Sequence, residues 1–562
     1  MPTPIPESAN IARHLPLMAV AQPGVAALKI PRGRTPAGAI DYLTLSFAEL
    51  EAEAAGWQAT LTAHGVKRGD RVLVMVRQGL PLIASVFALF AHGAVPVVID
   101  PGMGRKAFLR CVERSQPRAL LGIPLARLFS HIFRKAFKSV SIRIAASGSA
   151  TARCPTPNAA AQLAVADSTP TELAAILFTS GSTGAPKGVC YEHGMFSAQV
   201  ELIRRTFDIQ PGEIDLPMLP IFALFNPALG MTTIVPEIDP TRPATVDPAK
   251  IVQAIQQERV TNSFGSPTLW LKIARHCHHE SLTLDSMRRV LSAGAPVPPE
   301  LWQLMQPILT QGELHSPYGA TEALPVASID ATTVVGETSA QTLKGQGTCV
   351  GPIIAGNEVK IIALSDDPIT TLEEALEITS PQIGEIIVRG PSVTQSYDAL
   401  PQATAKAKIT PASGDSGAAW HRMGDCGYFD EQGRLWFCGR AVERVETAQG
   451  VIFSEQVEPA FNAHPAVRRS ALIGLGNRPR QRAAIVIEPM EPKLVKTSSQ
   501  RRALSRELLK FTLGHPDASR INLFYFHAKF PVDVRHNAKI HRLTLTRWAE
   551  YEAKGIHIDP KK

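Results

Sequence analysis

The 562-residue sequence has few features of a secreted or membrane-spanning protein. Its seven cysteines are widely spaced and none form a C-x-x-C pair, which favours reduced thiols in a cytoplasmic protein. The first residues lack the basic stretch and apolar run of a secretory signal. The most apolar stretch, 81–99, is interrupted by His92, Gly93 and Pro96. A buried helix followed by a buried strand is therefore predicted there, because a membrane span needs roughly 20 uninterrupted apolar residues.

Excess charge is also scarce outside the C-terminal part of the chain. The net charge is +8, and the segment from Val442 onwards holds 21 lysines and arginines against 12 aspartates and glutamates. No nucleic-acid module or interleaving of aromatic and basic residues accompanies this charge, so a nucleic-acid partner is not expected. The basic part is interpreted as a solvated surface, or as a face that docks to partner enzymes or to the surface of a membrane.

The remaining sequence reads as alternating strands and helices. Ser46 is a plausible N-cap for a helix that begins at residue 47, and strands are predicted over 71–76, 94–99 and 173–178. This order predicts an α/β fold with a mostly parallel sheet. No repeat of fixed period is present. The composition changes after Gly439-Arg440, which places a domain boundary there, and the length also favours more than one domain.

The strongest functional signal is Leu177-Phe-Thr-Ser-Gly-Ser-Thr-Gly-Ala-Pro-Lys-Gly188, directly after an apolar strand. Glycines allow the backbone to turn its N–H groups towards an anion, hydroxyls donate to phosphate oxygens, and a lysine neutralises charge. The string therefore predicts a loop that grips a polyphosphate. It is not a Walker A loop, because no Gly-Lys pair is followed by Ser or Thr. Its candidate phosphate-binding residues are Thr179, Ser180, Gly181, Ser182, Thr183, Gly184 and Lys187.

This string resembles the phosphate loop of the adenylate-forming superfamily, which includes acyl-CoA synthetases, luciferases and the adenylation domains of peptide synthetases. Four further segments carry the resemblance in the family's order: 292–296, 318–322, 420–440 and 531–542. The resemblance implies that ATP and Mg²⁺ are used to convert a carboxylic acid into an acyl-AMP, with release of pyrophosphate.

The resemblance also implies a role for each matching residue. Gly294, Ala295 and Pro296 would border the adenine, and Tyr318, next to Gly319, would stack on it. Thr321 would contact phosphate and Glu322 would hold Mg²⁺, which prefers carboxylate and phosphate oxygens. Asp425 would accept both ribose hydroxyls, with Arg440 as a second ribose or phosphate contact. Lys539 would bridge the attacking carboxylate and the α-phosphate. The catalytic set implied is Lys539, Glu322, Thr179 and Lys187.

The family's architecture follows from the same resemblance. It implies a large N-terminal domain, 1–440, with two packed α/β sheet subdomains and a β-region, which binds ATP and the acyl substrate. A small mobile α+β domain, 441–562, would follow and carry Lys539. In this family the small domain rotates after adenylation. The hinge position that usually holds Asp or Lys is Val442 here.

A second departure concerns the acyl pocket. Many acyl-activating relatives have an aromatic-His pair where this chain reads Phe222-Ala223, and Phe225 follows. These three residues are predicted to line the substrate pocket. The segment 217–231 is similar to the branch of the family that makes β-lactones in bacterial long-chain olefin biosynthesis. That branch implies a 2-alkyl-3-hydroxy fatty acid whose own hydroxyl attacks the acyl-AMP, closing a β-lactone and releasing AMP.

Two other functions remain open at the level of the sequence. One is long-chain acyl-CoA synthesis, in which CoA attacks the acyl-AMP. The other is a nucleotide-binding scaffold that recruits pathway enzymes through its basic C-terminal part. No residue can be named as the base for the 3-hydroxyl. His193 is a candidate, although it also matches the residue with which a helix begins in the family.

Overall fold

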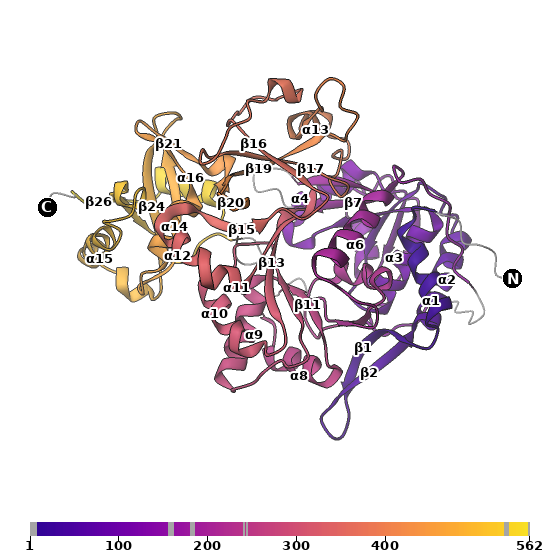
Figure 1. The fold of residues 1–562 in the computed structure, drawn as a ribbon. Coiled ribbons are helices and arrows are strands. Elements are labelled where there is room, and N and C mark those ends of the chain that lie inside the picture. The colour runs from indigo at the N-terminus through magenta and orange to yellow at the C-terminus, as the bar shows by residue number, and fades with distance from the viewer. Residues whose placement is uncertain are drawn as a thin grey trace.

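The computed structural model describes residues 8–155, 162–179, 186–239, 242, 245–532 and 539–559. The chain runs from the N-terminal sheets on the right of Figure 1 to a smaller C-terminal part on the left. Sheets with helices packed on them make up the larger part, and a more open β-region lies above them in this view. This arrangement agrees with the α/β fold expected from the sequence.

The N-terminal sheet has six strands in the order β6-β5-β3-β4-β7-β8. Neighbouring strands are parallel except for β7 and β8. The strands are β3 (Arg71–Met75), β4 (Val95–Ile99), β5 (Ala119–Gly122), β6 (Ile142–Ala145), β7 (Leu173–Thr179) and β8 (Lys187–Glu192). Of these, β3, β4 and β7 were predicted, and their bounds lie within one residue of the predicted ones.

Helices α2 (Phe47–Ala63) and α3 (Leu80–His92) pack against each other beside this sheet. The predicted cap of α2 is present as a capping box, because Ser46 accepts from the Glu49 N–H and Glu49 accepts from the Ser46 N–H. Helix α3 is apolar on every side and is buried along its length. It ends at Gly93, whose φ of 72° is the left-handed conformation that glycine adopts without strain.

The second sheet has eight strands in the order β14-β13-β12-β11-β9-β10-β1-β2. Two of them, β1 and β2, come from the start of the chain and form a hairpin that extends from the body (Figure 1). The strands are β1 (Ala26–Arg34), β2 (Ile40–Ser46), β9 (Ile214–Asp215), β10 (Thr232–Ile234), β11 (Asn262–Gly265), β12 (Arg289–Ser292), β13 (Glu313–Ala320) and β14 (Ala323–Asp330).

The β-region contains a sheet of order β15-β20-β19-β17-β16, with β18 paired to β19. Its neighbouring strands are antiparallel. It consists of β15 (Thr348–Pro352), β16 (Glu358–Ile362), β17 (Gly384–Arg389), β18 (Lys408–Ile409), β19 (Trp420–Phe429) and β20 (Arg434–Arg440).

The C-terminal part has its own apolar core, centred on Phe461, Ile485 and Phe524. A two-stranded sheet of β21 (Val445–Thr447) and β22 (Gly450–Ile452) precedes a four-stranded one. The latter contains β23 (Val467–Leu475), β24 (Arg482–Pro489), β25 (Leu523–Phe526) and β26 (Ile556–His557). Its helices are α14 (Ser454–Asn462), α15 (Ser498–Phe511) and α16 (Arg542–Tyr551).

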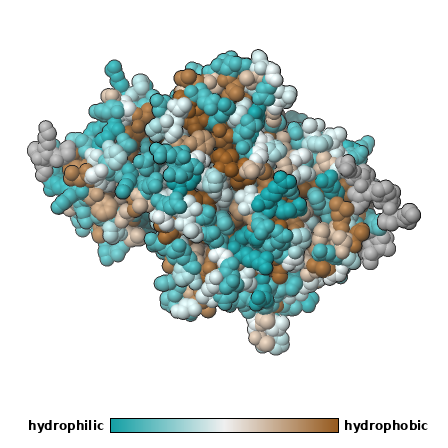
Figure 2. All heavy atoms as spheres, viewed as in Figure 1, coloured by the Kyte–Doolittle hydropathy of each residue, from teal (hydrophilic) through white to brown (hydrophobic). Residues whose placement is uncertain are grey.

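The other helices of the larger part join and cover the sheets. They are α1 (His14–Ala21), α4 (Arg105–Ser115), α5 (Pro124–Ile132), α6 (His193–Thr206), α7 (Asn226–Leu229), α8 (Pro248–Glu258), α9 (Pro267–His279), α10 (Pro299–Ile308), α11 (Ala331–Thr333), α12 (Ser339–Gln341) and α13 (Pro401–Ala407). Within the described ranges, no helix combines the length and the apolar character that crossing a bilayer requires. Figure 2 shows hydrophilic side chains over most of one face, with hydrophobic ones gathered near its centre.

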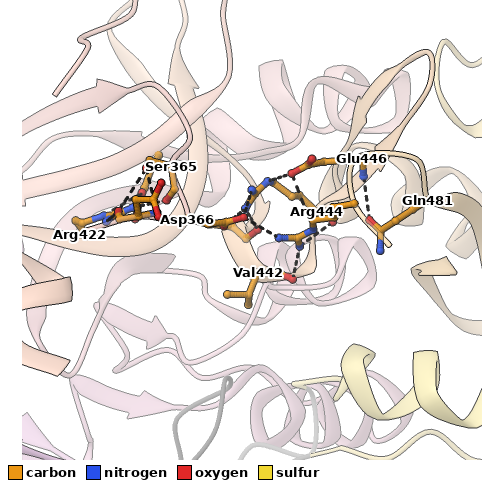
Figure 3. A network of polar contacts seen from close by, with 11 residues as sticks. Ser365, Asp366, Arg422, Val442, Arg444, Glu446 and Gln481 are labelled. Carbon is orange, nitrogen blue, oxygen red and sulfur yellow. Dashed lines mark hydrogen bonds and ion pairs between the residues drawn. The ribbon is translucent and has the colours of Figure 1, made fainter. Parts of the chain in front are cut away.

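A polar network joins the two parts of the chain just after β20 (Figure 3). Arg444 forms ion pairs with Asp366 and with Glu446, and Arg478 donates to the carbonyl of Val442. On the other side, Arg422 of β19 donates to the carbonyls of Ser365 and Asp367. The loop after β16 therefore contacts both sides of the predicted boundary. The boundary at Arg440 itself stays a prediction.

Candidate active site

One cavity of about 2650 Å³ is lined by most of the candidate site residues that the structure describes, although Lys187 is not among them. Its lining comes from the N-terminal sheet, the eight-stranded sheet, the β-region and the C-terminal part. One end is polar and includes Glu322, Asp425, Arg440 and Lys539, whereas the other is built from aliphatic and aromatic side chains.

Three residues from three different strands meet at the polar end. Tyr318 of β13 donates its hydroxyl to Asp425 Oδ2 at 2.6 Å, and Arg440 donates to Asp425 Oδ1. Asp425 and Arg440 lie opposite each other in the β19–β20 register, which explains why residues 15 positions apart form a pair. The predicted adenine-edge residues Gly294, Ala295 and Pro296, and also Gly319, line the same cavity.

The electrostatics keep Tyr318 and Arg440 of this trio in fixed ionisation states. Burial, followed by the charge of Asp425, holds the pKa of Tyr318 well above its usual value, so the phenol remains a neutral donor. The adjacent carboxylate of Asp425 raises the pKa of Arg440. An ionised carboxylate offers about four lone-pair sites, of which these two donors use two. Asp425 therefore keeps acceptor capacity for two hydroxyls of a ligand.

Glu322 and Lys187 both contact Tyr397, a residue that was not predicted from the sequence. Tyr397 donates its hydroxyl to Glu322 Oε1 at 2.8 Å, and the Lys187 ammonium lies 4.6 Å from the centre of the Tyr397 ring. Thr321 lines the cavity beside Glu322, and its carbonyl accepts from the Tyr191 hydroxyl. A carboxylate and a cation therefore contact the same tyrosine, the two kinds of charge that bind a metal-complexed phosphate.

The rest of the predicted phosphate loop cannot be placed in this geometry. Thr179 is the last residue of β7, and Lys187 is the first residue of β8, with which it pairs across the two strands. Ser180, Gly181, Ser182, Thr183 and Gly184 lie outside the described residues. Their roles, and that of the Thr179 side chain, stay predictions.

Two further titratable residues lie behind Glu322. Lys408 donates to the carbonyl of Thr394, whose N–H donates to the Glu322 carbonyl at 2.9 Å. Burial lowers the pKa of Lys408 to about 7, and burial followed by the charge of Lys408 holds the pKa of His421 well below its usual value. Lys408 could have been found from the sequence, because it lies between the buried apolar residues Ala407 and Ile409. A charged residue in such a position is often part of a functional site.

Lys539 reaches the cavity from the C-terminal part. It lines the cavity together with Arg440 and Glu443. Burial raises the pKa of Glu443, and the charge of Lys539 partly opposes this rise. Three residues later, Arg542 forms ion pairs with Glu443 at 3.0 Å and with Glu458 at 2.6 Å. The segment that carries Lys539 is thereby attached to α14 and to the chain just after β20.

The apolar end is formed by the stretch that departs from the family pattern. The 3₁₀ helix η3 (Pro220–Leu224) places Phe222 against Phe264, with ring centres 3.9 Å apart, and Phe225 6.2 Å from Phe222. Phe222 and Phe225 line the cavity, whereas Ala223 does not. Ala223 is 4% exposed and packs into the apolar core, because successive residues of a helical turn point in different directions. That the acyl group of the substrate binds at this end of the cavity stays a prediction.

His193 is not positioned to act as the base for a substrate hydroxyl. It is the first residue of α6, is 2% exposed and does not line the cavity. Burial lowers the pKa of His193 to about 4, so its imidazole is neutral, and its Nδ1 has no hydrogen-bond partner among the described residues. Its ring packs edge-on against Phe90, which does line the cavity.

The model of the family described as "AMP-binding enzyme" matches residues 26–398. The chain belongs to this family of adenylate-forming enzymes. It is 44% identical to the olefin β-lactone synthetase of Xanthomonas campestris over 96% of this chain and 97% of that protein. The corresponding enzyme of Stenotrophomonas maltophilia is 43% identical, with 97% and 98% covered.

A solved structure of the family shows the same fold. The amide bond synthetase McbA from Marinactinospora thermotolerans superposes with a TM-score of 0.76 at 22% identity, covering 96% of this chain and 99% of that one. The protein is thus an ATP-dependent, adenylate-forming ligase with the α/β fold of its family, and the resemblance inferred from the ordered motifs is confirmed.

Proposed function

We propose that this AMP-binding enzyme makes a β-lactone from a long-chain 2-alkyl-3-hydroxy acid for olefin biosynthesis. The observation that carries the proposal is the similarity, over nearly the full chain, to two olefin β-lactone synthetases. The apolar end of the cavity supports it, because Phe222 and Phe225 offer aromatic surface where a long alkyl chain would pack.

In the first step the substrate carboxylate attacks the α-phosphorus of ATP, which forms the acyl-AMP and releases pyrophosphate. Asp425 and Arg440 would hold the ribose, and Tyr318 with residues 294–296 would border the adenine. Lys539 would stand between the carboxylate and the α-phosphate, where a cation offsets the charge that builds up on the attacked phosphate. Lys187 would neutralise the outgoing pyrophosphate.

Mg²⁺ fits the residues present. Glu322 has a hard anionic oxygen facing the cavity, and Tyr397 holds its carboxylate by a hydrogen bond at 2.8 Å. One carboxylate suffices when substrate phosphates and water complete the shell. When bound, the ion would neutralise charge on the phosphates, and Thr321 and Lys187 would act beside it.

In the second step the 3-hydroxyl oxygen attacks the acyl carbonyl carbon. The new C–O bond closes a four-membered ring, the C–O bond of the mixed anhydride breaks, the hydroxyl loses its proton, and AMP leaves. An internal nucleophile needs no second substrate once the chain is held in a folded conformer. The apolar wall would hold that conformer and exclude the water that competes for the anhydride.

The small domain, 441–562, is proposed to move between these steps, with its boundary after Arg440. Rotation would withdraw Lys539 from the cavity and would break the ion pair between Arg444 and Asp366. The site of action is proposed to be the cytoplasm, in keeping with seven cysteines that form no disulfide. The cations Arg502, Arg506 and Lys510, exposed at every fourth position of α15, would dock an acidic face of another pathway enzyme.

Product analysis tests this function. The protein is incubated with ATP, Mg²⁺ and a 2-alkyl-3-hydroxy fatty acid, with and without CoA, and the products are identified by mass spectrometry. A β-lactone and AMP in equal amounts without CoA are expected. A thioester that appears only with CoA would contradict lactone formation and would identify an acyl-CoA synthetase.

The matched 3-deoxy acid serves as the control. It has the same carboxylate and alkyl chains but no internal nucleophile, so it should release pyrophosphate and stop at the acyl-AMP. Formation of a lactone from the deoxy acid would rule out attack by the 3-hydroxyl.

A further inference from the structure

The segment from α4 to just past α5 is more basic than the rest of the N-terminal part of the chain. Residues 105–138 contain nine lysines and arginines and a single acidic residue, Glu113. Six of these cations are exposed, and none of the six forms an ion pair with a residue that the structure describes: Arg105, Lys106, Arg110, Arg134, Lys135 and Lys138. This excess is strong enough to attract an anionic surface.

An apolar stripe lies among these cations. Leu125, Leu128 and Ile132 of α5 are 67%, 56% and 64% exposed. Their spacing of three and four residues places them on one face of the helix. The other side of the helix is fixed in the core: Ala126 and Ser130 are buried there, and Phe129, which borders the stripe, packs against Phe108, Phe133 and Phe137. The stripe is therefore held outwards by the fold.

The stripe and the cations belong to one surface. The Arg105 guanidinium at the start of α4 lies 5.9 Å from the ring of Phe133, which directly follows α5. Arg134, Lys135 and Lys138 follow the last residue of the stripe within six positions. The surface lies beside the β5–β6 edge of the N-terminal sheet. We refer to the three apolar residues together with Arg105, Lys106, Arg134, Lys135 and Lys138 as the α4–α5 patch.

The patch is continuous with the substrate cavity. Leu125 and Arg105 belong to the patch and also line the cavity, as do Phe108, Ala126 and Phe129 directly beneath it. The apolar lining thus reaches the surface at the place where apolar side chains are exposed among cations.

We propose that the α4–α5 patch docks the enzyme on the surface of an anionic lipid bilayer. Leu125, Leu128 and Ile132 enter the level of the lipid headgroups, and the surrounding cations pair with lipid phosphates. If the substrate is the long-chain acid of the proposed function, docking places the mouth of the cavity against the phase in which such an acid dissolves. The docking itself does not depend on which acid is activated.

Vesicle co-sedimentation of the full-length protein tests the proposal without any substrate. The wild type should bind vesicles of phosphatidylcholine containing phosphatidylglycerol far better than pure phosphatidylcholine, and binding should weaken as salt is raised. Each basic residue near an anionic bilayer strengthens binding roughly fivefold, so Lys135→Glu/Lys138→Glu should weaken binding at least about 25-fold. Leu128→Ser/Ile132→Ser should also weaken it, with less dependence on salt.

A matched control uses the other basic surface of the chain. Arg502→Glu/Arg506→Glu makes the same change in net charge on α15 and should leave vesicle binding within about twofold of the wild type. Equal losses in both charge variants would overturn the patch as the docking site. Equal binding of the wild type to neutral and anionic vesicles would also overturn it, as would a dimer in light scattering that Leu128→Ser/Ile132→Ser dissociates.

Pyrophosphate release with a water-soluble acid monitors folding, because neither pair of patch substitutions touches the cavity lining. Unchanged release together with lost vesicle binding is the expected result. Failure of lactone formation in the product assay would leave vesicle binding unaffected, so the two proposals can fail separately.

Discussion

The two ends of the cavity are built in opposite ways. At the polar end, single residues from distant strands are held by directed contacts, such as those of Tyr318 and Arg440 with Asp425. At the apolar end, neighbouring residues of one short stretch supply the wall, and Phe222 and Phe225 contact each other by ring packing. Activity should therefore fall sharply when a single polar group is removed at the polar end. At the apolar end, activity should instead depend on the volume of the side chains.

The largest expected effect is at the polar end. Lys539→Ala should lower the rate of pyrophosphate release roughly 10²- to 10³-fold, because the cation is needed when charge develops on the α-phosphate. ATP affinity should change little, since Lys187 and Asp425 remain. Stopped-time pyrophosphate assays and equilibrium nucleotide binding measure the two quantities.

Lys496→Ala, an exposed lysine of the same domain, is the matched control and should keep the full rate. A Lys539→Ala enzyme that releases pyrophosphate at the normal rate would remove Lys539 from the catalytic set.

Asp425→Ala should raise the KM for ATP roughly 100-fold, since two charge-assisted hydrogen bonds to ribose are lost. The KM for the acid should stay within about threefold of the wild type. Initial-rate kinetics with each substrate varied in turn separate the two constants. Asp367→Ala removes an exposed carboxylate elsewhere and should change neither. An equal rise in both constants would mean that Asp425 supports the fold rather than the nucleotide.

At the apolar end, Phe222→Ala should raise the KM for a long-chain acid roughly tenfold, because a large aromatic contact is lost. A short-chain acid should lose much less, and the KM for ATP should not change. The measurement is a chain-length series of acids at saturating ATP. A loss that is the same for every chain length would contradict alkyl packing on Phe222. Phe511→Ala, at an exposed phenylalanine of α15, controls for general effects.

The smallest effect concerns a carboxyl behind the apolar end. Asn226, next to Phe225, donates to Asp215 at 2.9 Å, and burial raises the pKa of Asp215 from 3.8 to about 7. A raised pKa stabilises the fold at acid pH, and this contribution is lost as the pH rises towards and through 7.

Asp215→Asn keeps the hydrogen bond and removes the titration. Its Tm should therefore exceed that of the wild type by roughly 1–3 °C at pH 8, and the two should converge below about pH 4, where the carboxyl is protonated in the unfolded chain as well. Thermal unfolding across this pH range measures the difference. A difference that is independent of pH would show that Asp215 does not titrate in this window.

Some features of the fold and of the site were predictable because they depend only on residues that are neighbours in the chain. The capping box of Ser46 and Glu49 and the strand–loop–strand order around Lys187 follow from local conformation. Tyr397 and His421 were not predicted, since no local pattern distinguishes them from surface residues. Lys408 was missed although it lies between the apolar residues Ala407 and Ile409. The α4–α5 patch was also missed, because its cations were averaged with the acidic residues of the rest of the N-terminal part.

The sequence by itself determined the family, the alternation of strands and helices, and the order of the motifs from Thr179 to Lys539. These depend on residue types at short spacing, which local backbone preference and hydrophobic periodicity translate directly into structure. Only the tertiary structure decided which motifs touch, that Ala223 turns into the core while Phe222 and Phe225 face the cavity, and that Leu125 lies at a basic opening. Those outcomes depend on packing between segments far apart in the chain. There, strand register and burial determine where each side chain points, and local conformational propensity does not.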